Sequence, residues 1–220
     1  MHQAHVILVH GIWMNPLELL PFGHRLKRLG FKVHYFNYNS LLHPPAKAAE
    51  KLRAKINRLN AAKLHYVAHS LGGLVLMHLF EQFDDLPPGR VVMLGSPIQG
   101  SQLAQRLAGS IFLRPFVGRS MERALSGEDI PEWDNDREWA MLAGTKPLGI
   151  GSLFGGFDSP NDGTVLIDET RHPAQKQHLS LPYGHLKLLY SSATPTLTAQ
   201  FLISGSFNDS RREMDGKLHP

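Results

Sequence analysis

VAHSLGG (Val67–Gly73) is the stretch that decides the fold. The apolar run ending at Ala68 is typical of a buried strand, and the residues after Gly72 are typical of a helix. A serine between two such elements lies on a sharp turn, where a strained backbone requires small residues two positions away on each side. Ala68 and Gly72 satisfy that requirement. The stretch therefore predicts a nucleophilic Ser70, with an ordinary helix N-cap serine as the alternative.

Apolar strands and amphipathic helices alternate around this turn. Apolar runs predict strands at 6–9, 32–38, 63–68, 90–95, 138–144 and 179–181. Helices are expected at 16–29, at about 46–60 and at 72–83. In the first of these helices the residues at helical spacing are Leu17, Leu20, Leu26 and Leu29. The alternation predicts the α/β class, with a mostly parallel sheet of about six strands and helices on both faces.

Length and composition fit one soluble domain. The chain has 220 residues, of which 42% are hydrophobic and 19% are charged. It has no cysteine, which excludes disulfides, thiolate metal sites and a cysteine nucleophile. The first residues form neither a signal peptide nor a membrane span, so we expect a cytoplasmic protein.

We expect one domain over residues 1–207 and a polar tail at 208–220. The long segment 98–137 breaks the alternation of strands and helices. It has an apolar centre, IFLRPFV (Ile111–Val117), and an acidic end. We interpret this insertion as a candidate lid or cap, with a packed helix pair of the core as the alternative.

The net charge of +4 is unevenly distributed, because residues 1–70 hold ten Lys/Arg and two acidic residues. Most of these cations belong to two predicted helices, which should cover opposite faces of the sheet. We therefore interpret them as solvated helix faces. Nucleic-acid binding is not expected, because no basic motif is interleaved with aromatic residues. The pattern gives only weak support to peripheral contact with a membrane.

Active groups of an open parallel sheet gather at the carboxyl ends of its strands. A serine nucleophile also needs a base, an acid that orients the base, and donors for an oxyanion. The His10-Gly11 turn follows the first strand, where one oxyanion donor is expected. The predicted donors are the backbone N–H groups of Ile12 and Leu71, with a plain glycine turn as the alternative at the first of them.

The predicted base is His185, on a loop just past the last strand, from which its ring can reach Ser70. The chain contains thirteen histidines, so position decides among them. His69 adjoins Ser70, but we expect its side chain to point elsewhere. His178 lies at the wrong end of its strand, and His172 and His5 are expected at the surface.

The predicted acid is Asp162, in the loop FDSPNDGTV (157–165) after the fifth strand. Asp158 and Asp168 are alternatives, and Asn-Asp-Gly also has a simple interpretation as a tight turn. The order is then Ser70, Asp162, His185. That order differs from those of trypsin-like and subtilisin-like enzymes.

These motifs resemble those of the α/β-hydrolase superfamily, and of its small bacterial lipases and esterases in particular. The resemblance rests on AHSLGG (68–73), LGSPIQGS (94–101), NDGTV (161–165) and GHL (184–186), in that order along the chain. It implies a minimal α/β-hydrolase fold.

The resemblance also implies hydrolysis of carboxylic esters through an acyl-enzyme. Ser70 would attack the ester, His185 would take its proton, and Asp162 would orient His185. The substrate would be a small-molecule or lipid ester, and neither a cofactor nor a metal is implied. The alternatives are a thioesterase or acyltransferase with the same triad, or a non-catalytic binding protein of the same fold.

Overall fold

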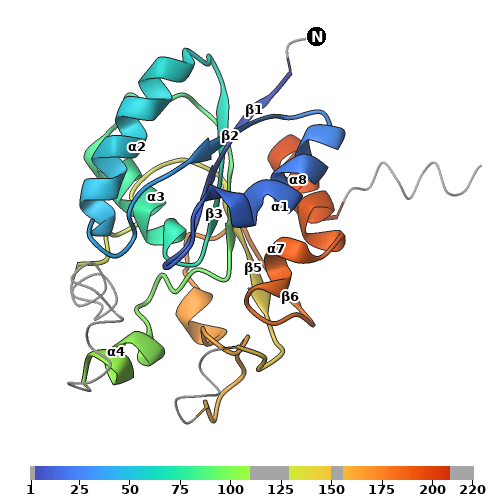
Figure 1. Ribbon diagram of the computed structural model, residues 1–220. Helices are drawn as coiled ribbons and strands as arrows, with labels where there is room; N and C mark the ends of the chain where they lie inside the picture. The colour runs from blue at the N-terminus through green and yellow to red at the C-terminus, as the bar shows by residue number, and fades with distance from the viewer. Residues whose placement is uncertain (1–2, 110–128, 150–155, 209–220) are drawn as a thin grey trace, which may run out of the picture.

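Six parallel strands form one sheet in the computed structural model, which describes residues 3–109, 129–149 and 156–208 (Figure 1). Their order is β2-β1-β3-β4-β5-β6. The strands are β1 (His5–Val9), β2 (Lys32–Phe36), β3 (Leu64–His69), β4 (Val91–Leu94), β5 (Trp139–Gly144) and β6 (Gln177–Leu181). Each predicted strand is therefore present, with ends that shift by one or two residues. The predicted parallel α/β sheet is confirmed, and every pairing in it is parallel.

Helices cover both faces of this sheet, as predicted. On one face lie α2 (Pro45–Leu59) and α3 (Gly72–Gln82), and on the other α1 (Leu20–Arg28), α7 (Lys187–Tyr190) and α8 (Ala193–Ser204) (Figure 1). The short elements are α4 (Gln102–Ala108) and the 3-10 helices η1 (Pro16–Leu19) and η3 (Asp168–Thr170). The two basic helices, α1 and α2, consequently lie on opposite faces.

Side-chain alternation along β1 divides the core into two layers. Ile7 and Val9 pack toward α2 and α3, whereas Val6 and Leu8 pack toward α1 and α8. All four side chains are buried. Burial of one such aliphatic side chain contributes about 1.5–3 kcal/mol, so the two layers hold the sheet rigid beneath the loops at its carboxyl edge.

The leucine spacing located the first helix but not its buried face. The hydrophobic side chains that are buried here are those of Leu19, Phe22 and Leu26. Three of the four leucines at helical spacing are exposed, namely Leu17, Leu20 and Leu29. The helix opens with a 3-10 turn that Asn15 and Glu18 cap reciprocally. Within α1, Leu20 and Leu26 are six residues apart, about 240° around an α-helix, so they lie on different faces and only Leu26 faces the sheet.

The described parts of segment 98–137 pack into the core. Leu103 and Leu107 of α4 are buried with the α2 and α3 layer, and the ring of Trp133 lies 4.8 Å from that of Trp139. The apolar centre of the segment lies outside the described residues, as does the tail from 209 onward. No helix in the described part of the chain is long and apolar enough to cross a membrane.

Candidate active site

Ser70 lies on a strained turn between β3 and α3. Its φ is +54°, in the left-handed region that a non-glycine residue adopts only at a cost. The N-cap position of α3 is occupied by Leu71 and has no side-chain cap, so the N-cap interpretation of Ser70 is wrong. A Cβ on Gly72 would lie 2.7 Å from the Val9 carbonyl oxygen, so only glycine fits there. The turn thus raises a serine at the carboxyl edge of the sheet.

Asp162 and His185 form a buried hydrogen-bonded pair. The His185 Nδ1 lies 2.6 Å from the Asp162 Oδ2, and both side chains are almost fully buried. The other carboxylate oxygen accepts hydrogen bonds from the backbone N–H groups of Thr164, at 3.0 Å, and Val165, at 2.8 Å. A carboxylate against Nδ1 favours the tautomer that carries its proton on Nδ1. The Nε2 of His185 is then an acceptor.

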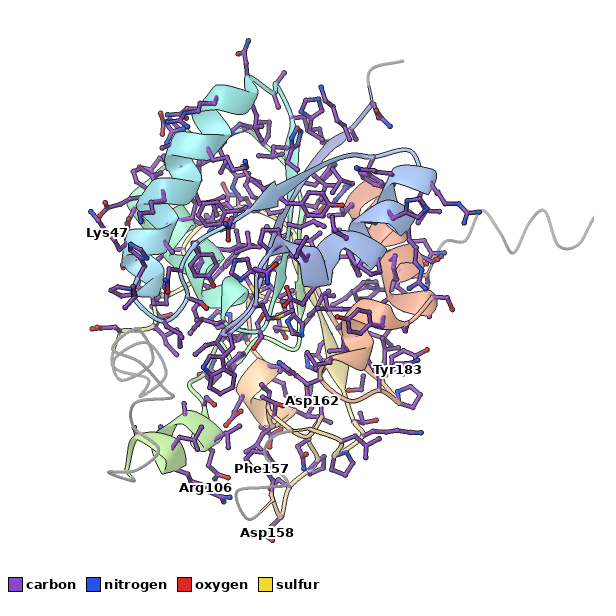
Figure 2. The ribbon with its side chains drawn as sticks, viewed as in Figure 1. Lys47, Arg106, Phe157, Asp158, Asp162 and Tyr183 are labelled. Atoms are coloured by element: carbon purple, nitrogen blue, oxygen red, sulfur yellow. The ribbon has the colours of Figure 1, made fainter. Side chains whose placement is uncertain are left out.

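The rival acids lie away from this pair. Asp158 and Asp168 are exposed, and the Asp168 side chain is 86% accessible to solvent. Figure 2 shows Asp158 at the outer tip of its loop and Asp162 nearer the sheet. Among the rival histidines, His178 contacts the Thr170 hydroxyl, at 2.8 Å. The structure therefore brings Asp162, and neither rival, to a histidine.

Gly95, at the end of β4, is a residue of the site that the sequence did not single out. Its φ is +54°. A Cβ there would lie 3.1 Å from both the Asp162 Oδ2 and the His185 Nδ1. The hydrogen-bonded pair therefore rests on the bare backbone of Gly95. In the sequence, Gly95 ends an apolar strand run and lies within LGSPIQGS (94–101), but neither feature assigns it this role.

His69 contacts the predicted base, His185, and within the described residues it has no hydrogen bond to Ser70. Its ring centroid lies 4.6 Å from that of His185, and its Nε2 lies 3.3 Å from the His185 carbonyl oxygen. The contact arises because the loop that carries His185 folds back across the end of β3. Burial, followed by the nearby His185, holds the pKa of His69 well below its usual value. His69 is thus a neutral ring that packs beside the base.

The His10-Gly11 turn lies against the serine. A Cβ on Gly11 would be only 2.9 Å from the Ser70 Cβ. The His10 ring is buried, stacks on Tyr38 at 4.5 Å, and donates from Nδ1 to the Gly11 carbonyl oxygen at 2.9 Å. Burial lowers the pKa of His10. His10 therefore shapes the turn as a neutral ring.

The two predicted oxyanion donors flank this contact. Ile12 follows Gly11 and lines the cavity described below, and Leu71 follows Ser70 at the start of α3. Neither backbone N–H has a hydrogen-bond acceptor within the described ranges. Unpaired N–H groups at the start of a helix and on a turn are suited to bind a developing negative charge.

A cavity of about 630 Å³ opens over Ser70 and His185. Its wall is mostly apolar, and the aliphatic and aromatic side chains that line it include Ile12, Trp13, Met14, Leu148, Leu186 and Tyr190. A cavity of this size and character suits a small organic ligand. Within the described residues, no group of three or more His, Asp or Glu side chains could hold a metal ion.

Comparisons with known proteins bear on the fold of the chain. A family model described as a domain of unknown function (DUF7379) matches residues 8–114. No curated protein matches the sequence. The mature lipase BlEst2 of Bacillus licheniformis is 20% identical, with a TM-score of 0.68 over 93% of this chain and 92% of the lipase.

Two further solved structures are similar over nearly their whole length. A monoacylglycerol lipase from Paleococcus ferrophilus is 16% identical, with a TM-score of 0.59 over 92% of this chain and 95% of that one. An extracellular α/β-hydrolase from a Paenibacillus species is 14% identical, with a TM-score of 0.56 over 93% of this chain and all of that one. Together with the parallel sheet and its crossover helices, these likenesses show that the chain has the α/β-hydrolase fold.

Proposed function

We propose that this protein is a serine hydrolase that cleaves carboxylic esters through an acyl-enzyme. The proposal rests on one observation, which is that three features meet at one cavity. Ser70 is held in a left-handed turn, His185 lines the same cavity, and the buried Asp162 is bonded to the far nitrogen of His185. The lipases of the same fold add support.

In the proposed mechanism, the Ser70 Oγ attacks the ester carbonyl carbon while the His185 Nε2 takes the hydroxyl proton. Asp162 keeps His185 in the required tautomer and stabilises the imidazolium. The N–H groups of Ile12 and Leu71 bind the oxyanion. The intermediate collapses, the C–O bond to the alcohol breaks, and His185 returns its proton to the leaving alkoxide. Water, activated by the same histidine, then releases the carboxylic acid and regenerates Ser70.

A thioesterase or an acyltransferase is the second candidate. Both use the same acyl-enzyme and differ only in the leaving group or in the nucleophile that accepts the acyl group. A non-catalytic protein of the same fold is a third candidate. It would not require a nucleophile on a strained turn beside a buried Asp–His pair.

The test measures turnover of p-nitrophenyl esters from acetate to palmitate, together with labelling by a fluorophosphonate probe. The wild type is compared with Ser70→Ala and with Ser96→Ala. Ser96 is a matched control, because it is another buried serine at the carboxyl end of a strand. We expect Ser70→Ala to lose both turnover and labelling, and Ser96→Ala to keep both.

The pattern of activities separates the candidates. Turnover of thioesters but not oxygen esters would favour the thioesterase, and product formation only in the presence of an added alcohol would favour the acyltransferase. If Ser70→Ala retained the activity of the wild type, the assignment of Ser70 would be wrong. If the folded wild type neither reacted with the probe nor turned over any acyl substrate, the non-catalytic candidate would stand.

A further inference from the structure

Two lysines lie on neighbouring loops in the wall of the candidate cavity. Lys146 follows β5, and Lys187 is the first residue of α7, two positions after His185. The Lys146 backbone N–H donates to the Tyr183 carbonyl oxygen at 3.1 Å. A Cβ on Gly184 would lie 2.7 Å from the Leu148 carbonyl oxygen, so these loops pack closely. Both lysines are therefore carried by a rigid part of the site.

Neither ammonium group has an acidic partner within the described ranges. The side chains of both lysines are exposed at the cavity mouth. Among the described residues, the one carboxylate that lines the cavity belongs to Glu18, which accepts hydrogen bonds from the backbone N–H of Asn15, at 2.9 Å, and from its side-chain amide, at 3.3 Å. Among the described residues the two lysine ammonium groups therefore form no ion pair, and they lie at the rim of a mostly apolar cavity whose one carboxylate is taken up by the cap at Asn15.

A nearby arginine is already occupied. Arg25 of α1 donates to the backbone carbonyl oxygens of Tyr190, at 2.8 Å, and Ser191, at 2.6 Å, and so joins α1 to the end of α7. Its charge stabilises the carboxyl end of that helix. The two lysines differ from it, because nothing in the described fold requires their charge.

We propose that Lys146 and Lys187 bind a negatively charged oxygen group of the substrate. The natural ester would then be amphiphilic, with an apolar chain in the cavity and a carboxylate or phosphate at its mouth. This substrate class rests on the proposed ester hydrolase function. Lysine acts as a point charge with a flexible apolar stem, so it suits an anion at the edge of an apolar cavity.

The first experiment compares two esters of similar length, 4-nitrophenyl hexanoate and mono-4-nitrophenyl adipate, which differ by a terminal carboxylate. The quantity measured is the ratio of kcat/KM for the adipate to that for the hexanoate. Exposed charge pairs are individually weak, so we expect the ratio to fall about threefold in Lys146→Met or Lys187→Met and about tenfold in the double variant. Arginine at either position should restore it, and 0.5 M NaCl should weaken the effect in the wild type.

Lys63→Met is the matched control. Lys63 lines a separate cavity beyond the amino ends of β3 and β4, so the same loss of charge there should leave the ratio unchanged. A ratio unaffected by the double variant, or lowered equally by Lys63→Met, would overturn the proposed subsite. Ester hydrolysis itself would still stand in that case.

The second experiment needs no catalysis. Calorimetry measures the binding of hexyl phosphate, hexanoate and 1-heptanol to Ser70→Ala, with and without the two lysines. We expect the two anions to bind more tightly than the alcohol, and removal of the lysines to abolish that difference. The anion that binds more tightly indicates whether the charged group of the substrate is a phosphate or a carboxylate. Equal binding of all three ligands would refute the subsite, whether or not the wild type proves to be a hydrolase.

Discussion

Gly95→Ala should lower catalytic activity by a larger factor than its modest loss of folding stability would explain. The added methyl group would meet the Asp162 Oδ2, the His185 Nδ1 and the Leu188 Cδ1, each at 3.1 Å. Asp162 cannot yield freely, because two backbone N–H groups hold its other oxygen. His185 therefore has to move by a few tenths of an ångström. A displacement of about 1 Å near a reacting group can cost about 100-fold in rate, so we expect kcat to fall about 10- to 100-fold.

The cost in stability has a separate origin. An alanine in the left-handed region costs about 1–2 kcal/mol, and the crowded contacts add to that figure. For a chain of this length about 1 kcal/mol corresponds to a shift in Tm of roughly 2–4 °C, so the backbone cost alone should lower the Tm of Gly95→Ala by about 2–8 °C.

Gly30→Ala is the matched control, because Gly30 has a φ of +95° and no atom within 4 Å of an added Cβ. It should lose stability without losing activity on p-nitrophenyl butyrate. The assay also follows the low-field NMR signal of the Nδ1 proton of His185, which should shift in Gly95→Ala alone. If Gly95→Ala kept kcat within twofold of Gly30→Ala, the claim that Gly95 supports the Asp162–His185 pair would be refuted.

Three further predictions concern the acid, the core and the pH dependence of folding. Asp162→Asn should lower kcat by about 10³- to 10⁴-fold in the same ester assay, whereas Asp158→Asn should change it less than about twofold; the reverse result would move the acid to residue 158. Leu26→Ala should cost about 2–5 kcal/mol in urea unfolding and Leu17→Ala less than about 0.5 kcal/mol, because Leu26 is buried and Leu17 is 68% exposed. Burial and, to a lesser extent, the nearby cations Lys63 and Arg90 lower the pKa of His65 to about 4. The unfolded chain therefore binds this proton more readily than the folded chain, and the stability of the fold decreases as the pH drops from 6.5 to 4. Between pH 7 and pH 4.5 the wild type should therefore lose about 2–3 kcal/mol more than His65→Gln, and equal losses in urea titrations would contradict the assignment.

Local patterns predicted the strands and the turn that carries Ser70. A strand that is buried on both faces reads as an unbroken apolar run, as in Val6–Val9, so its position follows from a few consecutive residues. The small residues Ala68 and Gly72 similarly predict the turn at Ser70. The physical constraint in both cases acts within one short segment, and that is why a single sequence reveals it.

Contacts between distant segments could not be predicted in this way. The roles of Gly95 and His69 depend on where the loop that carries His185 folds. The residues next to Gly95 and His69 in the sequence do not reveal the position of that loop. Three aspartates share similar local surroundings in the sequence, but only the fold separates the buried Asp162 from the exposed Asp158 and Asp168.

Backbone strain provides an independent argument that the cavity is a functional site. Among the described residues, three non-glycine residues have a positive φ: Trp13, Asn60 and Ser70. Asn60 ends α2, where a left-handed residue is an ordinary helix terminus. The other two both line the cavity over His185. Each strained residue costs about 1–3 kcal/mol, a large fraction of the net stability of a domain, and such residues persist where a function requires their geometry. The strained pair at the cavity therefore points to the same place as the buried Asp162–His185 hydrogen bond, although the two observations rest on different physics.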